Sequence, residues 1–401
     1  MKVVMIAPFG LYPKGTVRVR ALPMARALAE RGHQVTLLIP PWDHPCAAGT
    51  SFESGGVRVI NLRLPPGLPL AFHVMLTARL ARQALALRPD VVHCFKPKAY
   101  AGLGHWLLWW LRRLRLTRLG LRLVVDEDDW ERAWNAIIPY SLPQKWLFAR
   151  QESWGLRHAD AVTAASRELV KLIGAEGVAV ARIFYVPNGV WPSSAARNSM
   201  RAQTVRMLWE LDDAPVILLY SRFLEFKLER IVSIMRQVVA RQPRVRLLVV
   251  GEGWYGEQAD LDDLLTAAGL ESYVRFTGWL PAEQLPDHFA AADVAMFPYD
   301  DTLINRTKCS VKLTELLAAG LPVVADAVGQ NSEYIVDGVT GRLVAPGNDA
   351  AFAEALLQLL ADPSQRARLG AAAARDIQER FAWPRLIGEV ERAYQVGAVL
   401  P

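Results

Sequence analysis

The stretch RTKCSVKLTELLAAGLPVVADAVGQN, residues 306–331, contains the alternation of elements that decides the fold. A polar loop comes first, a helical pattern follows it, and the apolar strand LPVVA comes directly afterwards. A helix that leads straight into an apolar strand is typical of parallel sheets covered by helices on both faces. The stretch therefore predicts an α/β protein.

The same alternation recurs on both sides of this stretch. In the first half we expect strands at 2–8, 34–40, 57–62, 90–95, 122–127, 160–166 and 182–188, with helices at 18–31, 73–87, 99–113, 141–157 and 166–174. In the second half we expect strands at 215–220, 245–250, 273–277, 293–297 and 321–325, each followed by a helix. The pattern predicts two doubly wound domains that bind their ligand where the carboxyl ends of the strands face a cleft.

Composition agrees with two domains, because a chain of 401 residues with 52% apolar content can bury large cores. We place the N-terminal domain at 1–188 and the C-terminal domain at 214–380. We interpret residues 189–213, which are polar and Ser/Ala/Arg-rich and then helical in pattern, as the connection between them. Residues 381–401 are expected to form a last helix, interrupted at Pro384.

Charge is distributed unevenly along the chain. Residues 1–190 carry 25 Lys and Arg against 13 Asp and Glu, a balance of +12, whereas residues 191–401 carry 21 against 27, a balance of −6. This asymmetry indicates an anionic partner for the first half alone, either a phospholipid surface or a phosphorylated acceptor. The sequence has no aromatic–basic recognition motif, so no nucleic-acid partner is expected.

The three cysteines, Cys46, Cys94 and Cys309, are scattered without ligand spacing, which is typical of a reducing, cytoplasmic compartment. The start of the chain lacks the layout of a cleavable signal, and no apolar run reaches the roughly 20 residues that span a bilayer. We therefore expect a cytoplasmic protein that is either soluble or peripheral at the inner face of the plasma membrane.

Two cations and a helix start form the strongest candidate site. Arg222 and Lys227 lie at a strand exit in SRFLEFK, and a loop with Lys308 and Ser310 precedes the helix of the opening stretch. Ser310 is a suitable N-cap, so the backbone N–H groups after it would point at an anion. This combination predicts a site for a diphosphate.

Glu315 lies one turn into that helix, where its carboxylate could hold a ribose. An alternative is that Lys312 and Glu315 form an ordinary i,i+3 pair on an exposed helix. That alternative leaves Arg222 and Lys227 unexplained, so we favour the ligand site.

Two glycine-rich loops follow strands. GEGWYG (251–256) has the glycine spacing of a dinucleotide-binding fingerprint. We reject that function, because Trp254 and Tyr255 are bulky where the backbone must approach a pyrophosphate. We interpret it as a turn that lines the cleft. GLYPKGT (10–16) has no lysine after Gly15, which excludes a triphosphate loop, and Gly15 either admits a ligand or belongs to a plain turn.

DEDDWE (126–131) collects five carboxylates at a strand end. Asp126 and Asp128 could bind a metal, a carboxylate could act as a base or stabilise a transition state, or the acids could simply favour a helix dipole. We favour a functional role, because the acids cluster in an otherwise basic domain. His93, in contrast, is interpreted as a satisfied structural residue.

The segment HWLLWWLRRLRLTRLGLR (105–122) is first apolar and then basic. Its arginines point in several directions on a helical wheel, so the segment lacks a clean amphipathic face. Two interpretations stand equal: a buried helix end before a solvated basic turn, or shallow membrane insertion with arginines on headgroups. The candidate acceptor or membrane residues are Arg112, Arg113, Arg115 and Arg118.

The ordered set of motifs resembles the family-4 retaining glycosyltransferases of the GT-B fold. KVVMIAPFG, ALAERGHQVTLL, DVVH, ADAVTAAS and VPNGV are similar to landmarks of their acceptor domain. SRFLEFK, LLVVGEG, VRFTGWL, AADVAMFP and KLTELLAAGLPVVA resemble their donor domain, and FAWPRLIGEVERAY resembles the closing helix that crosses back to the first domain. The resemblance implies two Rossmann-like domains that face a central cleft.

The resemblance also implies roles for residues of the donor domain. Arg222 and Lys227 would neutralise the donor diphosphate, and Glu315 would bind the nucleotide ribose. The loop with Lys308 and Ser310 would meet the phosphates and the sugar.

From the opposite domain, the resemblance implies that Gly15 lies against the donor phosphates. It further implies a hexosyltransferase-type enzyme that uses a nucleotide-sugar as donor substrate, with no cofactor and no metal. The leaving phosphate would deprotonate the acceptor on the same face of the sugar, so that anomeric configuration is retained.

Two residues depart from the family pattern. Thr307 stands where a second glutamate is frequent, and the strand that often ends in histidine ends in Asp126, which would take the catalytic, sugar-facing role. The leading hypothesis is a transferase that extends a lipid-linked or cell-surface glycan. The alternatives are a degenerate sugar-nucleotide-binding subunit and a GT-B epimerase or phosphorylase.

Overall fold

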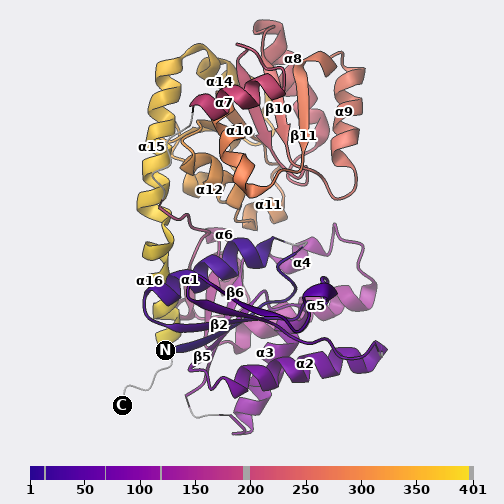
Figure 1. The fold of residues 1–401 in the computed structure, drawn as a ribbon, viewed down its shortest axis with the longest axis vertical. Coiled ribbons are helices and arrows are strands. Elements are labelled where there is room, and N and C mark those ends of the chain that lie inside the picture. Colours follow the sequence, from indigo (N-terminus) through magenta and orange to yellow (C-terminus); the bar gives the residue numbers. More distant parts are fainter. Residues whose placement is uncertain (13–14, 68, 118–119, 193–198, 397–401) are drawn as a thin grey trace. The chain divides into compact units, whose positions relative to one another are not determined.

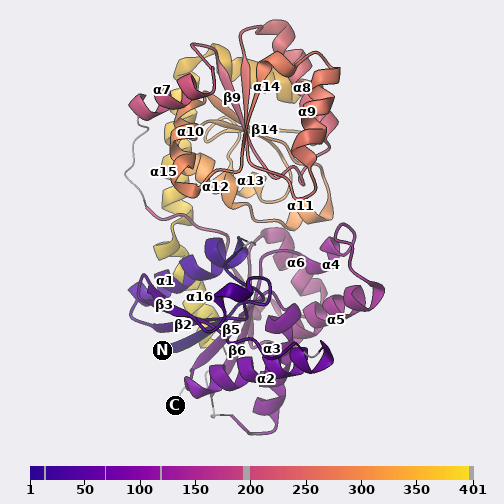
Figure 2. The same ribbon diagram turned by 45° about the vertical axis from the view of Figure 1, so that its right-hand side comes forward.

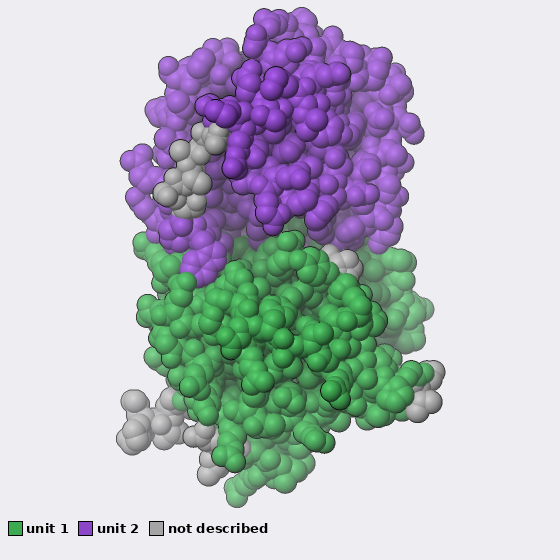
Figure 3. Space-filling model, viewed as in Figure 1, with its two compact units in different colours: residues 1–188, 307–309, 383–401 green, residues 189–306, 310–382 purple. Residues whose placement is uncertain are grey.

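The computed structural model describes residues 1–12, 15–67, 69–117, 120–192 and 199–396. The chain divides into two compact units, which Figure 3 draws in two colours. Unit 1 comprises Met1–Asn188, Thr307–Cys309 and Trp383–Pro401, and unit 2 comprises Gly189–Arg306 and Ser310–Ala382. Each unit has one sheet between layers of helices (Figures 1 and 2), so the prediction of two Rossmann-like α/β domains is confirmed.

Unit 1 contains an eight-stranded sheet in the order β3-β4-β2-β1-β5-β6-β7-β8. Its strands are β1 (Lys2–Ile6), β2 (Gln34–Ile39), β3 (Ser51–Ser54), β4 (Val57–Asn61), β5 (Val91–Phe95), β6 (Arg122–Glu127), β7 (Ala161–Ala164) and β8 (Ile183–Tyr185). All neighbours pair in parallel except β3 and β4. Central strands such as β5 are buried along their whole length, as parallel strands covered on both faces must be.

The helices of unit 1 form layers on the two faces of this sheet. They are the π-helical turn η1 (Val17–Ala21), α1 (Leu22–Glu30), α2 (Pro69–Ala86), α3 (Ala99–Arg113), α4 (Glu131–Trp134), α5 (Leu142–His158), α6 (Arg167–Ala175) and α16 (Trp383–Gln395), with short 3₁₀ turns η2 (Pro45–Ala47) and η3 (Val180–Arg182). Helix α3 packs between α2 and α5 in one layer, and α1 packs against α16 (Figure 1).

Unit 2 contains a six-stranded parallel sheet in the order β11-β10-β9-β12-β13-β14. Its strands are β9 (Val216–Tyr220), β10 (Arg246–Val250), β11 (Val274–Gly278), β12 (Val294–Phe297), β13 (Val323–Asp326) and β14 (Arg342–Val344). Its helices are α7 (Ser199–Leu208), α8 (Leu228–Arg241), α9 (Glu257–Ala267), α10 (Leu285–Ala291), α11 (Leu303–Thr307), α12 (Val311–Ala318), α13 (Asn331–Tyr334), α14 (Asp349–Ala361) and α15 (Pro363–Phe381), with 3₁₀ turns η4 (Glu271–Tyr273) and η5 (Ala282–Gln284).

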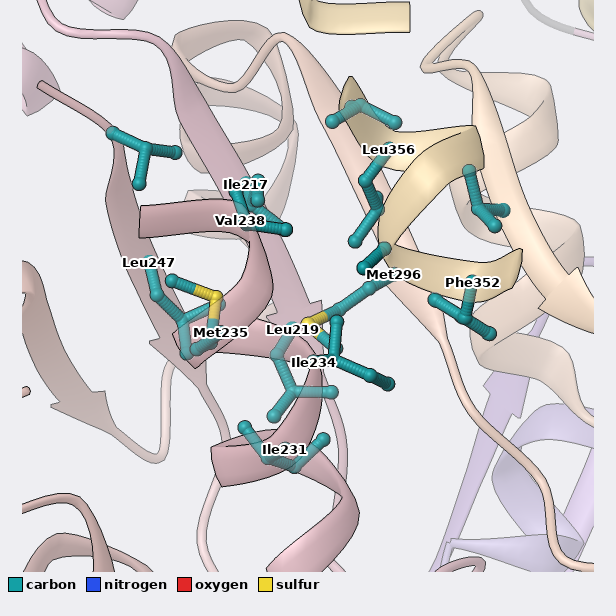
Figure 4. Close-up of a cluster of buried hydrophobic side chains, with 14 of the residues drawn as sticks. Ile217, Leu219, Ile231, Ile234, Met235, Val238, Leu247, Met296, Phe352 and Leu356 are labelled. Carbon is teal, nitrogen blue, oxygen red and sulfur yellow. The ribbon is translucent and has the colours of Figure 1, made fainter. Parts of the chain in front are cut away.

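The core of unit 2 anchors the strand ends that carry the candidate site. Figure 4 shows side chains of β9 and β10, of α8, and of β12 and α14 gathered in one cluster. On α8 the buried positions Ile231, Ile234, Met235 and Val238 recur at i, i+3, i+4 and i+7, which is the stripe of an amphipathic helix. This packing fixes the start of α8, and with it the loop that leaves β9.

Three features differ from the sequence predictions or were missed by them. The edge strands β3 and β14 are too short, and β3 too polar and exposed, to give a strand pattern. Pro384 does not interrupt the last helix, because α16 begins at Trp383 and proline is tolerated in a first turn, where its missing N–H has no intrahelical partner. Within the stretch 189–213, α7 packs against α10 as part of unit 2.

Candidate functional site

The loop between β9 and α8, residues 221–227, presents Arg222 and Lys227 from unit 2. Arg222 is half-buried and Lys227 is exposed at the N-cap of α8. Between them, Phe223 is buried with a φ of 63°, a left-handed conformation that costs a non-glycine residue about 1–3 kcal/mol. Such strain persists only where surrounding contacts impose it, and it is frequent at ligand sites.

Hydrogen bonds hold this strained loop in place. The Ser221 hydroxyl accepts from the N–H of Phe223 at 2.8 Å and donates to Glu225 Oε2 at 3.2 Å. The N–H of Lys227 donates to Asp300 Oδ2 at 2.9 Å, and Asn305 Nδ2 donates to the Glu225 carbonyl at 2.6 Å. The two cations therefore extend from a backbone fixed before any ligand arrives, which is how a protein lowers the cost of binding charge.

The glycine turn after β10 packs beside this loop. Gly251 has a φ of 122°, and a Cβ there would lie 2.0 Å from the Ser221 carbonyl oxygen, so no other residue fits. The Arg222 guanidinium lies 5.6 Å from the ring centroid of Trp254, which is half exposed. The prediction of a turn at 251–256 is confirmed, and Trp254 has a contact that the sequence did not suggest.

The start of α12 reaches the same strand end from another part of unit 2. The Lys312 ammonium lies 5.8 Å from the ring centroid of Tyr220, the last residue of β9. A pocket opens here, and its lining residues are Leu219, Tyr220, Ser221, Glu225, Phe226, Phe297, Pro298, Tyr299 and Lys312. Unit 2 therefore brings a cationic loop and the start of α12 to one strand end, as the sequence predicts for an anion site.

The remaining donor-domain residues take different positions. Ser310 is the N-cap of α12, but its hydroxyl makes no capping hydrogen bond, so the expected side-chain cap is wrong. Glu315 is half-buried one turn further on and does not line the pocket. Lys308 belongs to the segment Thr307–Cys309 that groups with unit 1, and Thr307 itself is buried. The ligand roles of these residues stay predictions.

In unit 1, Asp126 is fully buried in a charge network. Arg20 donates to both of its oxygens, from Nε at 2.6 Å and from Nη2 at 2.7 Å, and the Thr163 hydroxyl donates to Oδ1 at 2.6 Å. A carboxylate with these partners and no exposed surface is not placed to face a sugar. The geometry assigns Asp126 a structural role, and its catalytic role stays a prediction with this argument against it.

His93 continues the network, and its structural interpretation is confirmed. Its Nε2 lies 3.1 Å from the Thr163 hydroxyl and its Nδ1 lies 2.9 Å from the hydroxyl of Tyr394 on α16. Because Thr163 gives its proton to Asp126, the His93 Nε2–H must donate to Thr163, and Nδ1 must accept from Tyr394. Burial lowers the pKa of His93 to about 4, so the ring is neutral as this chain of bonds requires.

The other acids of DEDDWE surround Lys96, whose ammonium forms ion pairs with Asp128 at 3.0 Å, Asp129 at 2.8 Å and Glu131 at 2.9 Å. Burial raises the pKa of Asp128 to about 7 despite Lys96. Burial would also raise the pKa of Glu131, but Lys96 and a second lysine lower it to about 2. In the described ranges, no group of three or more His, Cys, Asp or Glu side chains is arranged to hold a metal ion.

Glu127 is the remaining acid of DEDDWE, and it differs from the other four. Both of its carboxyl oxygens are buried, and among the described residues neither has a hydrogen-bond partner. Burial raises the pKa of Glu127 well above its ordinary value, and the charges of Glu152 and Glu131 raise it further. The folded protein therefore keeps Glu127 as the neutral acid to a higher pH than the unfolded chain does.

A Glu127→Gln variant is expected to gain stability relative to the wild type as pH rises from about 5 to about 8. Because the pKa of Glu127 is higher in the folded than in the unfolded protein, its contribution to the free energy of unfolding is complete below the ordinary pKa of 4.5. This contribution is lost as pH rises, by up to ~1.4 kcal/mol per pH unit. Denaturant unfolding of both proteins at the two pH values measures the difference between their free energies of unfolding. The contributions of His93 and His105 are present in both proteins and cancel in this difference. A difference that does not change with pH would contradict the prediction.

The sequence left two interpretations open for the apolar and basic segment 105–122, and its basic part is exposed in the structure. Arg112 pairs with Asp160, whereas Arg113 and Arg115 are exposed, and Arg118 lies outside the described residues. The apolar half is partly buried, since Leu108 is fully buried whereas Trp106 and Trp110 are 48% and 42% exposed. Both interpretations therefore stay predictions. Over the described residues, no helix combines the length and apolarity needed to cross a membrane.

Gly15 lies directly before η1, where its carbonyl accepts from the N–H of Val19 at 2.9 Å. A Cβ at Gly15 would meet no atom within 4 Å. Unit 1 therefore gives no packing reason for glycine at this position, and its contact with a donor stays a prediction.

Unit 2 has a pocket at the carboxyl end of a central strand of a parallel α/β sheet, which is the usual position of a ligand site in this class of fold. The Glycosyl transferase 4-like domain matches residues 15–189, and Glycosyl transferases group 1 matches residues 214–362. The chain therefore belongs to the family-4 glycosyltransferases of the GT-B fold, as its motifs indicate. It is a nucleotide-sugar-dependent glycosyltransferase.

Individual relatives show the breadth of this similarity. A GDP-mannose-dependent alpha-(1-6)-phosphatidylinositol monomannoside mannosyltransferase of Mycolicibacterium smegmatis is 30% identical over 228 residues, 56% of this chain and 59% of that protein. A D-inositol 3-phosphate glycosyltransferase of Xylanimonas cellulosilytica is 29% identical over 395 residues, 92% of this chain and 88% of that protein. The crystal structure of Anabaena Alr3699/HepE in complex with UDP shares the fold, with a TM-score of 0.72 over 98% of both chains at 19% identity.

Proposed function

We propose that the protein is a retaining glycosyltransferase that moves a sugar from a nucleotide-sugar to a lipid-linked or cell-surface glycan acceptor. The observation that carries the donor half of this proposal is that the loop with Arg222 and Lys227 leaves β9 at the same strand end where Lys312 contacts Tyr220. Three cations beside a helix N-terminus suit the two phosphates of a nucleoside diphosphate.

The pocket chemistry supports a donor whose charge lies on its phosphates. The described pocket is lined mostly by apolar and aromatic side chains, with Lys312 as its cation and Glu225 as its carboxylate. The Glu225 carboxylate accepts a hydrogen bond from the Ser221 hydroxyl, so its negative charge points toward a residue of its own loop, 221–227. Glu315, one turn into α12, is proposed to accept hydrogen bonds from the ribose hydroxyls.

The proposed chemistry uses the donor phosphate itself as the base. The leaving phosphate oxygen takes the acceptor proton while the new glycosidic bond forms on the face that the phosphate leaves. Cations of unit 2 stabilise the charge that develops on the diphosphate, so no metal ion is required in this proposal.

The acceptor half of the proposal rests on the activities for which two relatives are named. One acts on a phosphatidylinositol monomannoside and another is named for D-inositol 3-phosphate. Both acceptors carry phosphate, and the first half of this chain has a balance of +12. We propose an acceptor of the inositol-phosphate or phosphatidylinositol class.

Nucleoside diphosphate release from UDP-, GDP-, ADP- and dTDP-sugars tests the proposal. Each donor is incubated alone, with inositol phosphate, and with phosphatidylinositol in detergent, with and without EDTA. We expect one donor to be cleaved in the presence of one acceptor, at a rate that EDTA does not change, with the product keeping the anomeric configuration by NMR. Diphosphate binding without release under any condition would instead support a degenerate subunit, and product inversion would overturn the retaining mechanism.

A further inference from the structure

One helical layer of unit 1 has an outer surface that combines tryptophans with cations. Trp106 and Trp110 on α3 are 48% and 42% exposed, and Trp146 on α5 is 67% exposed. Figure 1 shows α3 beside α2 and α5 in this layer. We call the outer surface of these three helices the tryptophan face.

Two of the exposed rings, Trp106 and Trp110, contact an aromatic seam between α3 and α5. The Trp106 and Trp110 ring centroids are 6.4 Å apart, and Trp109 lies 5.0 Å from Trp110 and 5.4 Å from Trp154 of α5. Trp154 in turn stacks on His158 at 4.1 Å. Rings held in this way lose little conformational freedom when they are covered, which favours binding.

The charge of this face has one sign. The sequences of α2, α3 and α5 contain seven Lys and Arg residues and a single acid, Glu152. Glu152 is fully buried and is neutralised by Arg132, so it contributes nothing to the outer surface. Arg113 and Arg115 stand exposed at the end of α3. An ordinary solvated helix layer carries both signs, and this one does not.

We propose that the tryptophan face docks on the surface of an anionic lipid bilayer. Indole rings favour the headgroup level of a bilayer, since one side of the ring system is apolar and the N–H is polar. Exposed arginines beside them are attracted to anionic headgroups. Arg112 and Arg157 already pair with Asp160 and Glu176, so a protein partner would need acids that match the remaining cations. An anionic bilayer supplies that charge at every position. The purpose of this docking rests on the proposed lipid-linked acceptor, but the docking itself does not.

Co-sedimentation with vesicles tests this inference without donor or acceptor. The protein is expected to bind vesicles of phosphatidylcholine and phosphatidylglycerol in equal parts, to bind phosphatidylcholine vesicles weakly, and to dissociate as salt is raised. A Trp106→Ser/Trp110→Ser variant should bind at least ~10-fold more weakly. An Arg113→Gln/Arg115→Gln variant should lose about 5-fold per arginine.

Matched controls come from exposed residues of unit 2. Met207→Ser/Leu208→Ser removes apolar surface of similar exposure from α7, and Arg241→Gln/Arg244→Gln removes two exposed charges near the end of α8. Both controls should bind vesicles as the wild type does. Circular dichroism and denaturant unfolding, which report on both units, verify that every variant stays folded.

The inference is overturned if the wild type stays in the supernatant with anionic vesicles at low salt, or if the tryptophan and arginine variants bind as well as the controls. Self-association that depends on Trp106 and Trp110, without vesicle binding, would assign the face to a second copy of this chain and would also overturn it. Vesicle binding that depends on this face while no donor is ever cleaved would leave the inference standing and refute the proposed function.

Discussion

An Arg222→Ala variant is expected to bind nucleoside diphosphate about 2–5 kcal/mol more weakly than the wild type, and Lys227→Ala is expected to show a loss in the same range. Removing either cation leaves negative charge of the bound diphosphate without its partner, and that uncompensated charge dominates the loss. Isothermal titration of UDP and GDP measures the effect directly. The corresponding rise in Kd is roughly 30-fold or more.

The loop geometry makes this prediction specific. Arg222 and Lys227 extend from a backbone held by Ser221, Asp300 and Asn305, so truncating either side chain should not disturb the loop itself. Arg236→Ala removes an exposed arginine from the outer side of α8 and is the matched control. Losses well below ~1 kcal/mol for both site variants, equal to the control, would move the diphosphate site elsewhere.

The sequence predicted the parts of the fold that depend on local periodicity. Apolar runs of β9 and β10 and the stripe of α8 can be read from neighbouring residues, so these elements appear where they are expected. Strand β14 could not be predicted, because three residues pair only when β13 is already in place. The pattern of neighbouring residues carries no information about a strand whose pairing depends on another strand.

The candidate sites also differ in whether neighbouring residues or distant residues form them. Arg222 and Lys227 are five residues apart on one loop, and their shared strand exit is visible in the sequence. The partners of Asp126 are not, since Arg20 is 106 positions away, and Tyr394 is 301 positions from His93. Carboxylates at a strand end suggested a ligand, whereas the fold brings an arginine to one of them and a lysine to three others. The long-range ion pairs decided what the acids of DEDDWE do.

The second large effect concerns this buried pair. Arg20→Ala is expected to lower the free energy of unfolding of unit 1 by about 3–5 kcal/mol, because it leaves the Asp126 carboxylate buried and unpaired. Asp126→Asn should destabilise similarly, since Arg20 then keeps its charge with two neutral acceptors, Asn188 and the Val186 carbonyl. Denaturant unfolding followed by circular dichroism measures both changes.

A double variant separates pairing from simple loss of structure. Arg20→Met/Asp126→Leu removes both charges and replaces them with apolar groups of similar size, which is often neutral for a buried ion pair. We therefore expect the double variant to be more stable than either single variant, with a coupling energy outside the range of independent sites. Additive losses would contradict a buried pair and indicate two unrelated contacts.

The same variants decide between the two roles of Asp126. If Asp126 faces a sugar, Asp126→Asn lowers turnover, spares nucleoside diphosphate affinity and leaves the unfolding free energy unchanged. If Asp126 supports the network, stability falls first, and the hydrogen-bond chain through Thr163 to His93 and Tyr394 is weakened with it. A Tyr394→Phe variant removes only the far end of that chain. A stability loss of about 1 kcal/mol in Tyr394→Phe, with donor binding unchanged, would show that α16 and the end of β6 are held by one network, and that Asp126 is its charged centre.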